Sequence, residues 1–413
     1  MSLLIKNCRL YIKDKVHVKN ILIKKGKIAK ISSDMRVSSL RTRSQVGEIF
    51  ADNIIDAKNN FVLPGLIDCH VHFREPGLTH KEDFLTGSMA AAKGGVTTIL
   101  DMPNTLPPTT TLQTLEEKRK MASKSIVNYG FHFGATSNNI SDMKKVKNIS
   151  AVKLYMDYTT GDLKVDDFEA IRQIFSISRI TIVHAEDLKV KNAIDILTKH
   201  KIKNKLHVAH VSSEEELKHA KMNAIKNQVT VEVTPNHLFM NENDLQNLGS
   251  FAEMKPRLKT EQDQKALWLG IKNGIVDIIA SDHAPHLKEE KEKVNYPFGV
   301  PGVETMLPLL LDAFNAGKIS LPAILKLCCE NPAKLFRIKN KGILKEGYDA
   351  DLVIVDLDKR QAVRNEDLMT KCKWSPFDGK ILKGWPVTTI VNGNVVYDNG
   401  EIFDVKAKEI DYL

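Results

Sequence analysis

The central part of the chain repeats one pattern: a short apolar run, a polar turn, and a segment with helical spacing of its apolar residues. The apolar runs predict eight strands, at residues 61–72, 96–102, 128–134, 150–156, 180–185, 206–211, 229–234 and 277–282. Eight strands that alternate with helices over about 225 residues are typical of a (β/α)8 barrel, or TIM barrel. We therefore expect an α/β protein with this barrel at residues 57–344.

Both ends of the chain show a different pattern. Residues 3–31 and 387–403 alternate apolar and polar positions, and two Asn-Gly pairs near the C-terminus are hairpin signals. Neither end has enough strands to fold alone. We therefore expect one β-sandwich domain beside the barrel, built from residues 1–56 and 345–413.

Composition and charge exclude several classes of protein. The 413 residues are 42% hydrophobic and 27% charged, which is typical of a soluble globular protein. The apolar runs are shorter than the ~20 residues that a membrane span needs, and the N-terminus lacks the features of a signal peptide, so we expect a cytoplasmic protein without membrane contact. The net charge of +9 is spread along the chain without a basic, aromatic-rich tract, which argues against nucleic-acid binding. The five scattered cysteines indicate reduced, structural thiols.

The first predicted barrel strand carries the most informative residues. His70 and His72 are two positions apart, so both imidazoles point to the same face of the strand. The same alternation turns Cys69 away from that face. Two imidazoles on one face can bind one divalent metal, although two hydrogen-bonded core histidines would have the same pattern.

Other predicted strands end in residues with similar chemistry. The fifth strand ends in His184, the sixth in His210 and the eighth in Asp282. A (β/α)8 barrel gathers its functional residues at the C-terminal ends of its strands, so we expect these side chains to converge. Imidazole and carboxylate are zinc ligands, and the set is larger than one catalytic zinc needs, which suits two metals.

A single lysine interrupts the fourth strand. Lys153 is the one charged residue among Ala151 to Met156. Either its side chain extends to the surface, or it faces the barrel interior, where burial lowers its pKa. A neutral amine can capture carbon dioxide as a carbamate, whose two oxygens can bridge two metals.

Taken together, these motifs resemble the amidohydrolase superfamily, and within it the dihydroorotase family. The resemblance covers nearly the whole chain, and it rests on the order in which the motifs occur. The motifs are residues 64–77 (PGLIDCHVHFREPG), 101–105 (DMPNT), 152–155 (VKLY), 184–186 (HAE), 207–212 (HVAHVS), 280–286 (ASDHAPH), 302–308 (GVETMLP) and 331–333 (NPA).

The resemblance implies a zinc enzyme with two Zn²⁺ ions in each chain. The ligands at matching positions are His70, His72 and Asp282 for one ion, and His184 and His210 for the other. Carboxylated Lys153 would bridge the two ions. Some dihydroorotases bridge through an aspartate a few residues later, so Asp157 is a rival for this role. His207 is three positions before His210, so it should face the other way, as a structural histidine.

The resemblance also implies how an anionic substrate binds. Arg74 offers a planar, bidentate donor to the carboxylate of dihydroorotate. Further contacts implied at matching positions are Asn104, His286 and the backbone of Phe298 and Gly299. Lys255 stands where relatives carry Asn or Arg, which leaves its role open. Thr159 and Thr160 lie on a segment that resembles the mobile loop that closes over substrate.

The implied activity is the reversible cyclisation of N-carbamoyl-L-aspartate to L-dihydroorotate in de novo pyrimidine biosynthesis. In the hydrolytic direction, a zinc-activated hydroxide would attack the ring amide, with Asp282 as general acid and base. One alternative is another cyclic amidohydrolase (a hydantoinase, dihydropyrimidinase or allantoinase), for which Arg74 would have no anionic partner. The other is an inactive relative kept as a scaffold. The sequence leaves open the oligomeric state and an association with aspartate transcarbamoylase.

Overall fold

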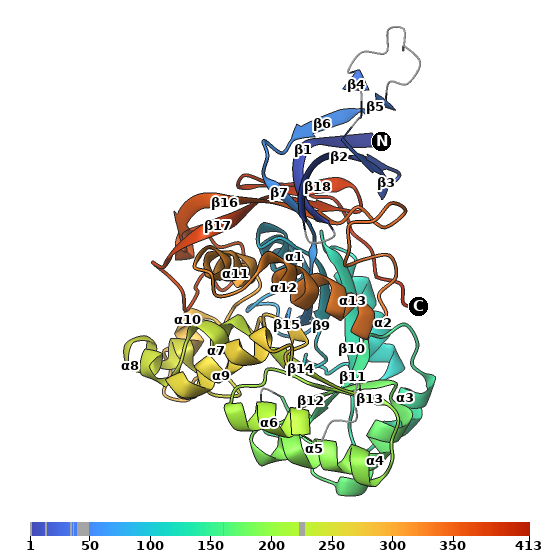
Figure 1. The fold of residues 1–413 in the computed structure, drawn as a ribbon. Coiled ribbons are helices and arrows are strands. Elements are labelled where there is room, and N and C mark those ends of the chain that lie inside the picture. Colours follow the sequence, from blue (N-terminus) through green and yellow to red (C-terminus); the bar gives the residue numbers. More distant parts are fainter. Residues whose placement is uncertain are drawn as a thin grey trace.

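The chain folds into a parallel barrel with a separate sheet on one side of it (Figure 1). The structure, a computed structural model, describes residues 2–12, 15–33, 35, 37–38, 49–159, 161–222 and 228–413. Within this described part, no helix is long and apolar enough to cross a membrane.

Eight parallel strands form the barrel, and their spatial order follows the chain. They are β8 (Leu66–Val71), β9 (Val96–Asp101), β10 (Asn128–Gly134), β11 (Ala151–Tyr155), β12 (Ile180–His184), β13 (Lys205–Val208), β14 (Val229–Val233) and β15 (Ile278–Ile279). The last strand meets the first through a parallel bridge between Val71 and His283, and the His72 amide donates to the His283 carbonyl at 2.8 Å. The predicted barrel is thus confirmed.

Helices surround the barrel on its outside (Figure 1). Several begin at capping boxes that satisfy the free N–H groups of the first turn: Asp83 caps α1, Thr111 caps α2 and Thr260 caps α9. The α-helices are α1 (Phe84–Lys93), α2 (Leu112–Ala122), α3 (Ile140–Lys145), α4 (Phe168–Ile177), α5 (Leu188–Lys199), α6 (Glu214–Met222), α7 (Pro235–Phe239), α8 (Leu245–Leu248), α9 (Glu261–Lys272), α10 (Lys288–Lys291), α11 (Met306–Asn315), α12 (Leu321–Leu325) and α13 (Asn331–Leu335).

The second unit is one nine-stranded sheet to which both ends of the chain contribute. Its strands are β1 (Ser2–Ile12), β2 (Lys15–Lys24), β3 (Lys27–Ser32), β6 (Asn53–Asp56), β7 (Phe61–Pro64), β16 (Leu352–Ala362), β17 (Ile381–Val391), β18 (Asn394–Asp398) and β19 (Glu401–Ile402). A short separate pair consists of β4 (Val37–Ser38) and β5 (Ile49–Phe50). Apolar side chains from both ends, such as Ile5, Ile23 and Ile354, form one core. Burial of these faces against each other stabilises strands that could not fold separately.

The predicted strand 61–72 is divided between the two units. β7 pairs antiparallel with β16 and contacts β1, so it belongs to the terminal sheet, and β8 begins the barrel. Gly65 separates them, at a place where a Cβ atom would lie 2.2 Å from the side chain of Thr97. The domain boundary at residue 57 stays a prediction, and the residues just after it still pair with the terminal sheet.

The lower part of the barrel interior is packed with apolar side chains, among them Ile67, Leu100, Ile182 and Ile278. These residues fill the centre below the strand ends, as in other (β/α)8 barrels. β17 packs against α1 and α11, which joins the terminal sheet to the outside of the barrel.

Candidate active site

Two histidines and one aspartate converge where the first and last barrel strands end. The Nε2 atoms of His70 and His72 lie 3.3 and 3.2 Å from the same oxygen of Asp282. Their possible ligand atoms all lie within 4.8 Å of one another. Three close groups of these types, on the same side of a pocket, suit one divalent metal.

The other two predicted ligands lie beside this group. His184 ends β12, His210 follows β13, and the Nδ1 atom of the first lies 2.8 Å from Nε2 of the second. The ring of His210 is also 5.3 Å, centre to centre, from the ring of His70. The structure therefore brings all four predicted histidines into one cluster at the end of the barrel.

Lys153, on β11, points into the cavity that the four histidines and Asp282 line. Its side chain is fully buried, and its Nζ has no hydrogen-bond partner among the described residues. Burial lowers the pKa of this amine to about 8. The rival Asp157 is engaged elsewhere, because it accepts hydrogen bonds from Lys189 Nζ at 2.7 Å and from the Glu186 amide at 2.9 Å.

The donor set fits a pair of metal ions. Buried polar atoms normally have partners, yet within the described structure both Lys153 Nζ and His210 Nδ1 lack one. Each lies next to imidazole or carboxylate groups that bind divalent cations. A metal ion fits between the facing His184 Nδ1 and His210 Nε2 atoms, and the Lys153 amine lines the same cavity, where no described residue competes for it.

A buried guanidinium lies beside the predicted ligands. Arg74 is 1% exposed, its Nε donates to the Pro285 carbonyl at 3.1 Å, and its Nη2 lies 3.1 Å from His286 Nε2. Its Nη1 has no hydrogen-bond partner in the described part of the chain. Burial lowers the pKa of Arg74 to about 10, which still leaves it charged near neutrality.

One cavity contains most of the predicted site residues. Its lining consists of His70, His72, Arg74, Asn104, Lys153, Tyr155, Thr159, His184, His210, Lys255, Asp282, Ala284, Phe298 and Gly299. His286 stands behind this wall, in contact with Arg74 and with the Phe298 carbonyl at 3.0 Å. Thr160 lies outside the described residues.

The chain matches a known protein family over most of its length. The sequence profile of the Amidohydrolase family matches residues 61–396. The chain belongs to this family. Members of the amidohydrolase family generally use metal ions, which the histidine and aspartate group accommodates.

Individual relatives of this amidohydrolase match over nearly its whole length. A dihydroorotase of Methanosarcina mazei is 38% identical over 95% of this chain and 93% of its own, and one of Pyrococcus abyssi is 37% identical over 93% and 92%. Among solved structures, an L-hydantoinase (dihydropyrimidinase) from Arthrobacter aurescens superimposes with a TM-score of 0.89 at 31% identity, over 98% of this chain and 97% of its own. The chain is therefore an enzyme of the cyclic amidohydrolase type.

The amidohydrolase site contains a buried carboxylate that the sequence analysis missed. Glu232 on β14 accepts a hydrogen bond from His70 Nδ1 at 2.7 Å. A glutamate within the otherwise uncharged strand Val229–Val233 was the available signal, of the same kind as Lys153 in its strand.

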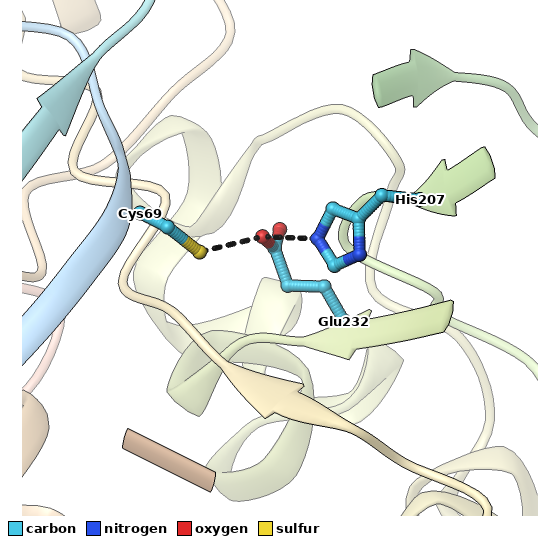
Figure 2. Close-up of side chains that lie close together, drawn as sticks. All are labelled: Cys69, His207 and Glu232. Atoms are coloured by element: carbon cyan, nitrogen blue, oxygen red, sulfur yellow. Dashed lines mark hydrogen bonds and ion pairs between the residues drawn. The ribbon is translucent and has the colours of Figure 1, made fainter. Parts of the chain in front are cut away.

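Two expectations about side-chain direction were wrong. Cys69 and His207 both turn into the barrel and contact Glu232, at 3.6 and 3.2 Å (Figure 2). Strict alternation fails because β8 changes register between Asp68 and Val71. In the sixth strand, it fails because His210 has a φ of +39°.

Tyr155 and Lys81 were also missed. Tyr155 lines the cavity, two positions after Lys153 on the same strand, so the alternation rule could have found it. Lys81 donates from Nζ to His286 Nδ1 at 3.0 Å and pairs with Glu290 at the same distance. This lysine lies in a loop, and the sequence carries no local signal for its role.

Three predicted site residues have a left-handed backbone. Arg74, His210 and Asp282 have φ values of +63°, +39° and +47°. Such a conformation costs a non-glycine residue ~1–3 kcal/mol and is common at functional sites. In each case it turns a side chain at or just beyond the end of a strand toward the cavity.

Proposed function

We propose that this amidohydrolase is a dihydroorotase that interconverts N-carbamoyl-L-aspartate and L-dihydroorotate in pyrimidine biosynthesis. The observation that carries the proposal is the buried Arg74, whose Nη1 is without a partner among the described residues and whose side chain lines the cavity beside the histidines. A desolvated cation with an open donor favours an anionic ligand, and a guanidinium matches a carboxylate geometrically. Dihydroorotate carries this carboxylate next to its cyclic amide. The similarity to dihydroorotases over nearly the whole chain supports the assignment.

A hydantoinase or dihydropyrimidinase is the second candidate. The structural similarity to the L-hydantoinase from Arthrobacter aurescens favours it. A shared fold and a shared set of metal ligands do not determine the substrate. Hydantoin and dihydrouracil lack a carboxylate, so they would offer no anionic acceptor to the buried Arg74 Nη1, which disfavours this candidate.

We further propose that two Zn²⁺ ions bind here, one at His70, His72 and Asp282 and one at His184 and His210. Lys153 would hold both ions as a carbamate. Its amine nitrogen would attack carbon dioxide and release one proton, and the carbamate formed shares one negative charge over two oxygens. A pKa of about 8 leaves part of this amine neutral near neutrality, as the reaction requires. Bound zinc supplies Lewis-acid polarisation and lowers the pKa of water.

Asp282 is the proposed general acid and base. Burial raises the pKa of its carboxyl, but the adjacent His70 and His72 more than offset this effect and hold the pKa below its usual value. Asp282 is therefore ionised and can accept a proton from the attacking water. It then delivers the proton to the leaving ring nitrogen, and the same steps run backwards during cyclisation.

Other lining residues would bind and orient the substrate. His72 Nδ1 donates to the Asn104 side-chain oxygen at 2.6 Å, so Asn104 directs the Nε2 atom of this histidine toward Asp282. Lys255 adds a second positive charge at the cavity wall, and Thr159 lies at its edge. A cytoplasmic location, substrate contacts of Phe298 and Gly299, and a docked aspartate transcarbamoylase stay predictions.

The test is turnover of L-dihydroorotate by the purified protein, run beside hydantoin, dihydrouracil and allantoin. Each reaction is measured as purified, after chelation, and after zinc is restored. Activity on dihydroorotate that disappears on chelation and returns with zinc supports the proposal. Activity confined to the neutral rings would identify the chain as a hydantoinase, dihydropyrimidinase or allantoinase instead. No activity despite bound zinc would favour a scaffold role.

A further inference from the structure

We infer that Glu232 is a positioning residue that holds one ligand from each of the two metal sites, and that His207 and Cys69 hold Glu232 from behind. The inference rests on the metal centre proposed above. Glu232 itself belongs to neither predicted ligand set, and it comes from the seventh strand, which supplies none of the predicted ligands.

One oxygen of Glu232 faces the predicted metal ligands. Oε1 accepts a hydrogen bond from His70 Nδ1 at 2.7 Å and another from the His210 backbone amide at 3.1 Å. Glu232 is 1% exposed, so these bonds form without competing water. Because His70 belongs to the first predicted ligand group and His210 to the second, this one carboxylate oxygen connects the two.

The other oxygen faces the lower barrel. Oε2 lies 3.2 Å from His207 Nε2 and 3.6 Å from the Cys69 thiol, and Figure 2 shows both groups directed at the carboxylate. His207 is held in turn by Thr230, whose hydroxyl oxygen lies 2.9 Å from its Nδ1. In a neutral His207 ring, the Nε2–H donates to Glu232 and Nδ1 accepts from this hydroxyl. The glutamate is thus fixed from both sides.

The chemistry of the neighbours explains why a carboxylate is needed here. The groups around Glu232 (two ring N–H groups, a backbone N–H and a thiol) all donate, and an ionised carboxylate only accepts. Because Glu232 accepts the hydrogen bond from His70 Nδ1, the proton of that ring stays on Nδ1, and Nε2 carries the lone pair. That lone pair faces Asp282, where the metal would bind.

The bond to His210 has a separate effect on the backbone. His210 has a φ of +39°, which a residue with a side chain adopts only when its surroundings hold it there. The hydrogen bond from its amide to Glu232 stabilises this conformation, which turns the imidazole toward His184. Loss of Glu232 would therefore disturb both predicted ligand groups.

A third metal site is the competing interpretation. The possible ligand atoms of Cys69, His207 and Glu232 lie within 4.8 Å of one another. Each of the three already has a hydrogen-bond partner within the cluster, and all are buried. Hydrogen bonding accounts for the arrangement without a metal, so we favour the positioning role.

The decisive variant is Glu232→Gln, because an amide keeps the shape but offers only one accepting oxygen to four donors. We expect zinc affinity, measured by competition with a chromophoric chelator, to fall by roughly 10–100-fold, as is typical when the hydrogen-bond partner of a metal ligand is lost. Asp351→Asn is the matched control. Asp351 is likewise buried, but its partners are Lys341, Asn128 and the Asn392 amide, so zinc affinity should be unchanged.

Further measurements separate positioning from misfolding and from failure of the proposed function. Thermal unfolding of the metal-free protein reports on the fold. If Glu232→Gln does not fold, His207→Leu serves as the second variant. It removes the ring N–H that donates to Glu232 Oε2, so it should also weaken zinc binding. Wild-type zinc affinity in a folded Glu232→Gln or His207→Leu protein would overturn the inference, and so would three zinc ions per wild-type chain with one lost in Cys69→Ala. Wild-type protein that binds no zinc would instead refute the proposed function.

Discussion

The Nζ atom of Lys81 lies 3.0 Å from Nδ1 of His286, on the opposite side of that ring from Arg74. Because a lysine only donates, Nδ1 of His286 accepts, and the Nε2–H donates to the Phe298 carbonyl at 3.0 Å, which holds the ring beside Arg74. Glu290, 3.0 Å from Lys81, balances the charge of this lysine. Lys81, His286 and Arg74 are thus three buried basic groups in a row, and the last of them, Arg74, lines the cavity.

Lys81→Met should weaken substrate binding without affecting metal content. A hydrogen bond to a charged group contributes ~1.5–3 kcal/mol, so we expect KM for dihydroorotate to rise by roughly tenfold or more. Zinc per chain should stay at the wild-type value. Steady-state kinetics and metal analysis check this result, with the exposed Lys288→Met in α10 as control. Equal KM values in the two variants would contradict a role for Lys81.

Arg74→Lys should be much less active although it keeps the positive charge. An ammonium group cannot reproduce the planar fork of a guanidinium. Breaking a buried charged pair costs ~2–5 kcal/mol, so kcat/KM for dihydroorotate should fall by roughly 30-fold or more. If the same variant gained activity on hydantoin, substrate charge would be confirmed as the property that Arg74 selects. An unchanged kcat/KM would exclude a substrate contact.

Zinc reconstitution of the metal-free protein should depend on pH and on carbon dioxide. Burial lowers the pKa of Lys153 to about 8, and only the neutral amine captures carbon dioxide. Below pH 8 the neutral fraction falls by about tenfold per pH unit, so reconstitution should slow as pH decreases and should speed up with added bicarbonate. Lys153→Ala should lose both dependences. A reconstitution rate that ignores bicarbonate would refute carboxylation.

Asp282→Asn should retain the fold and lose nearly all turnover. An amide cannot accept the proton from water, and loss of a positioned general base typically costs 10²–10⁴-fold in rate. Circular dichroism and thermal unfolding test the fold, and single-turnover kinetics test the chemical step. Rates near those of the wild type would remove Asp282 from the mechanism.

The predicted residues that share the cavity could be found from sequence because their signals are local. His70 and His72 share a face through the two-residue repeat of a strand, and Lys153 is conspicuous in an uncharged run. Three further residues, His184, His210 and Asp282, lie at the ends of predicted strands. They could be placed together because a (β/α)8 barrel gathers these strand ends on one side. The structure brings these residues into one cavity.

The parts that escaped prediction depend on contacts between distant residues. His70 and Glu232 are 162 positions apart, and Lys81 and His286 are 205 positions apart. Each pair meets only when the barrel closes. Cys69 turns inward at a register shift in β8, and His210 departs from its alternation with His207 because its backbone is left-handed. Hydrophobic spacing encodes neither feature.

Periodicity and residue type are local properties, so the order of residues was enough to predict the barrel, the terminal sheet and the kinds of side chain in the cavity. The groups that orient the predicted ligands, and the passage from one unit to the other at β7 and Gly65, became apparent only in the folded chain. A hydrogen bond in a buried site depends on the distance and direction of two groups. Those are determined only when strands far apart in the chain lie side by side.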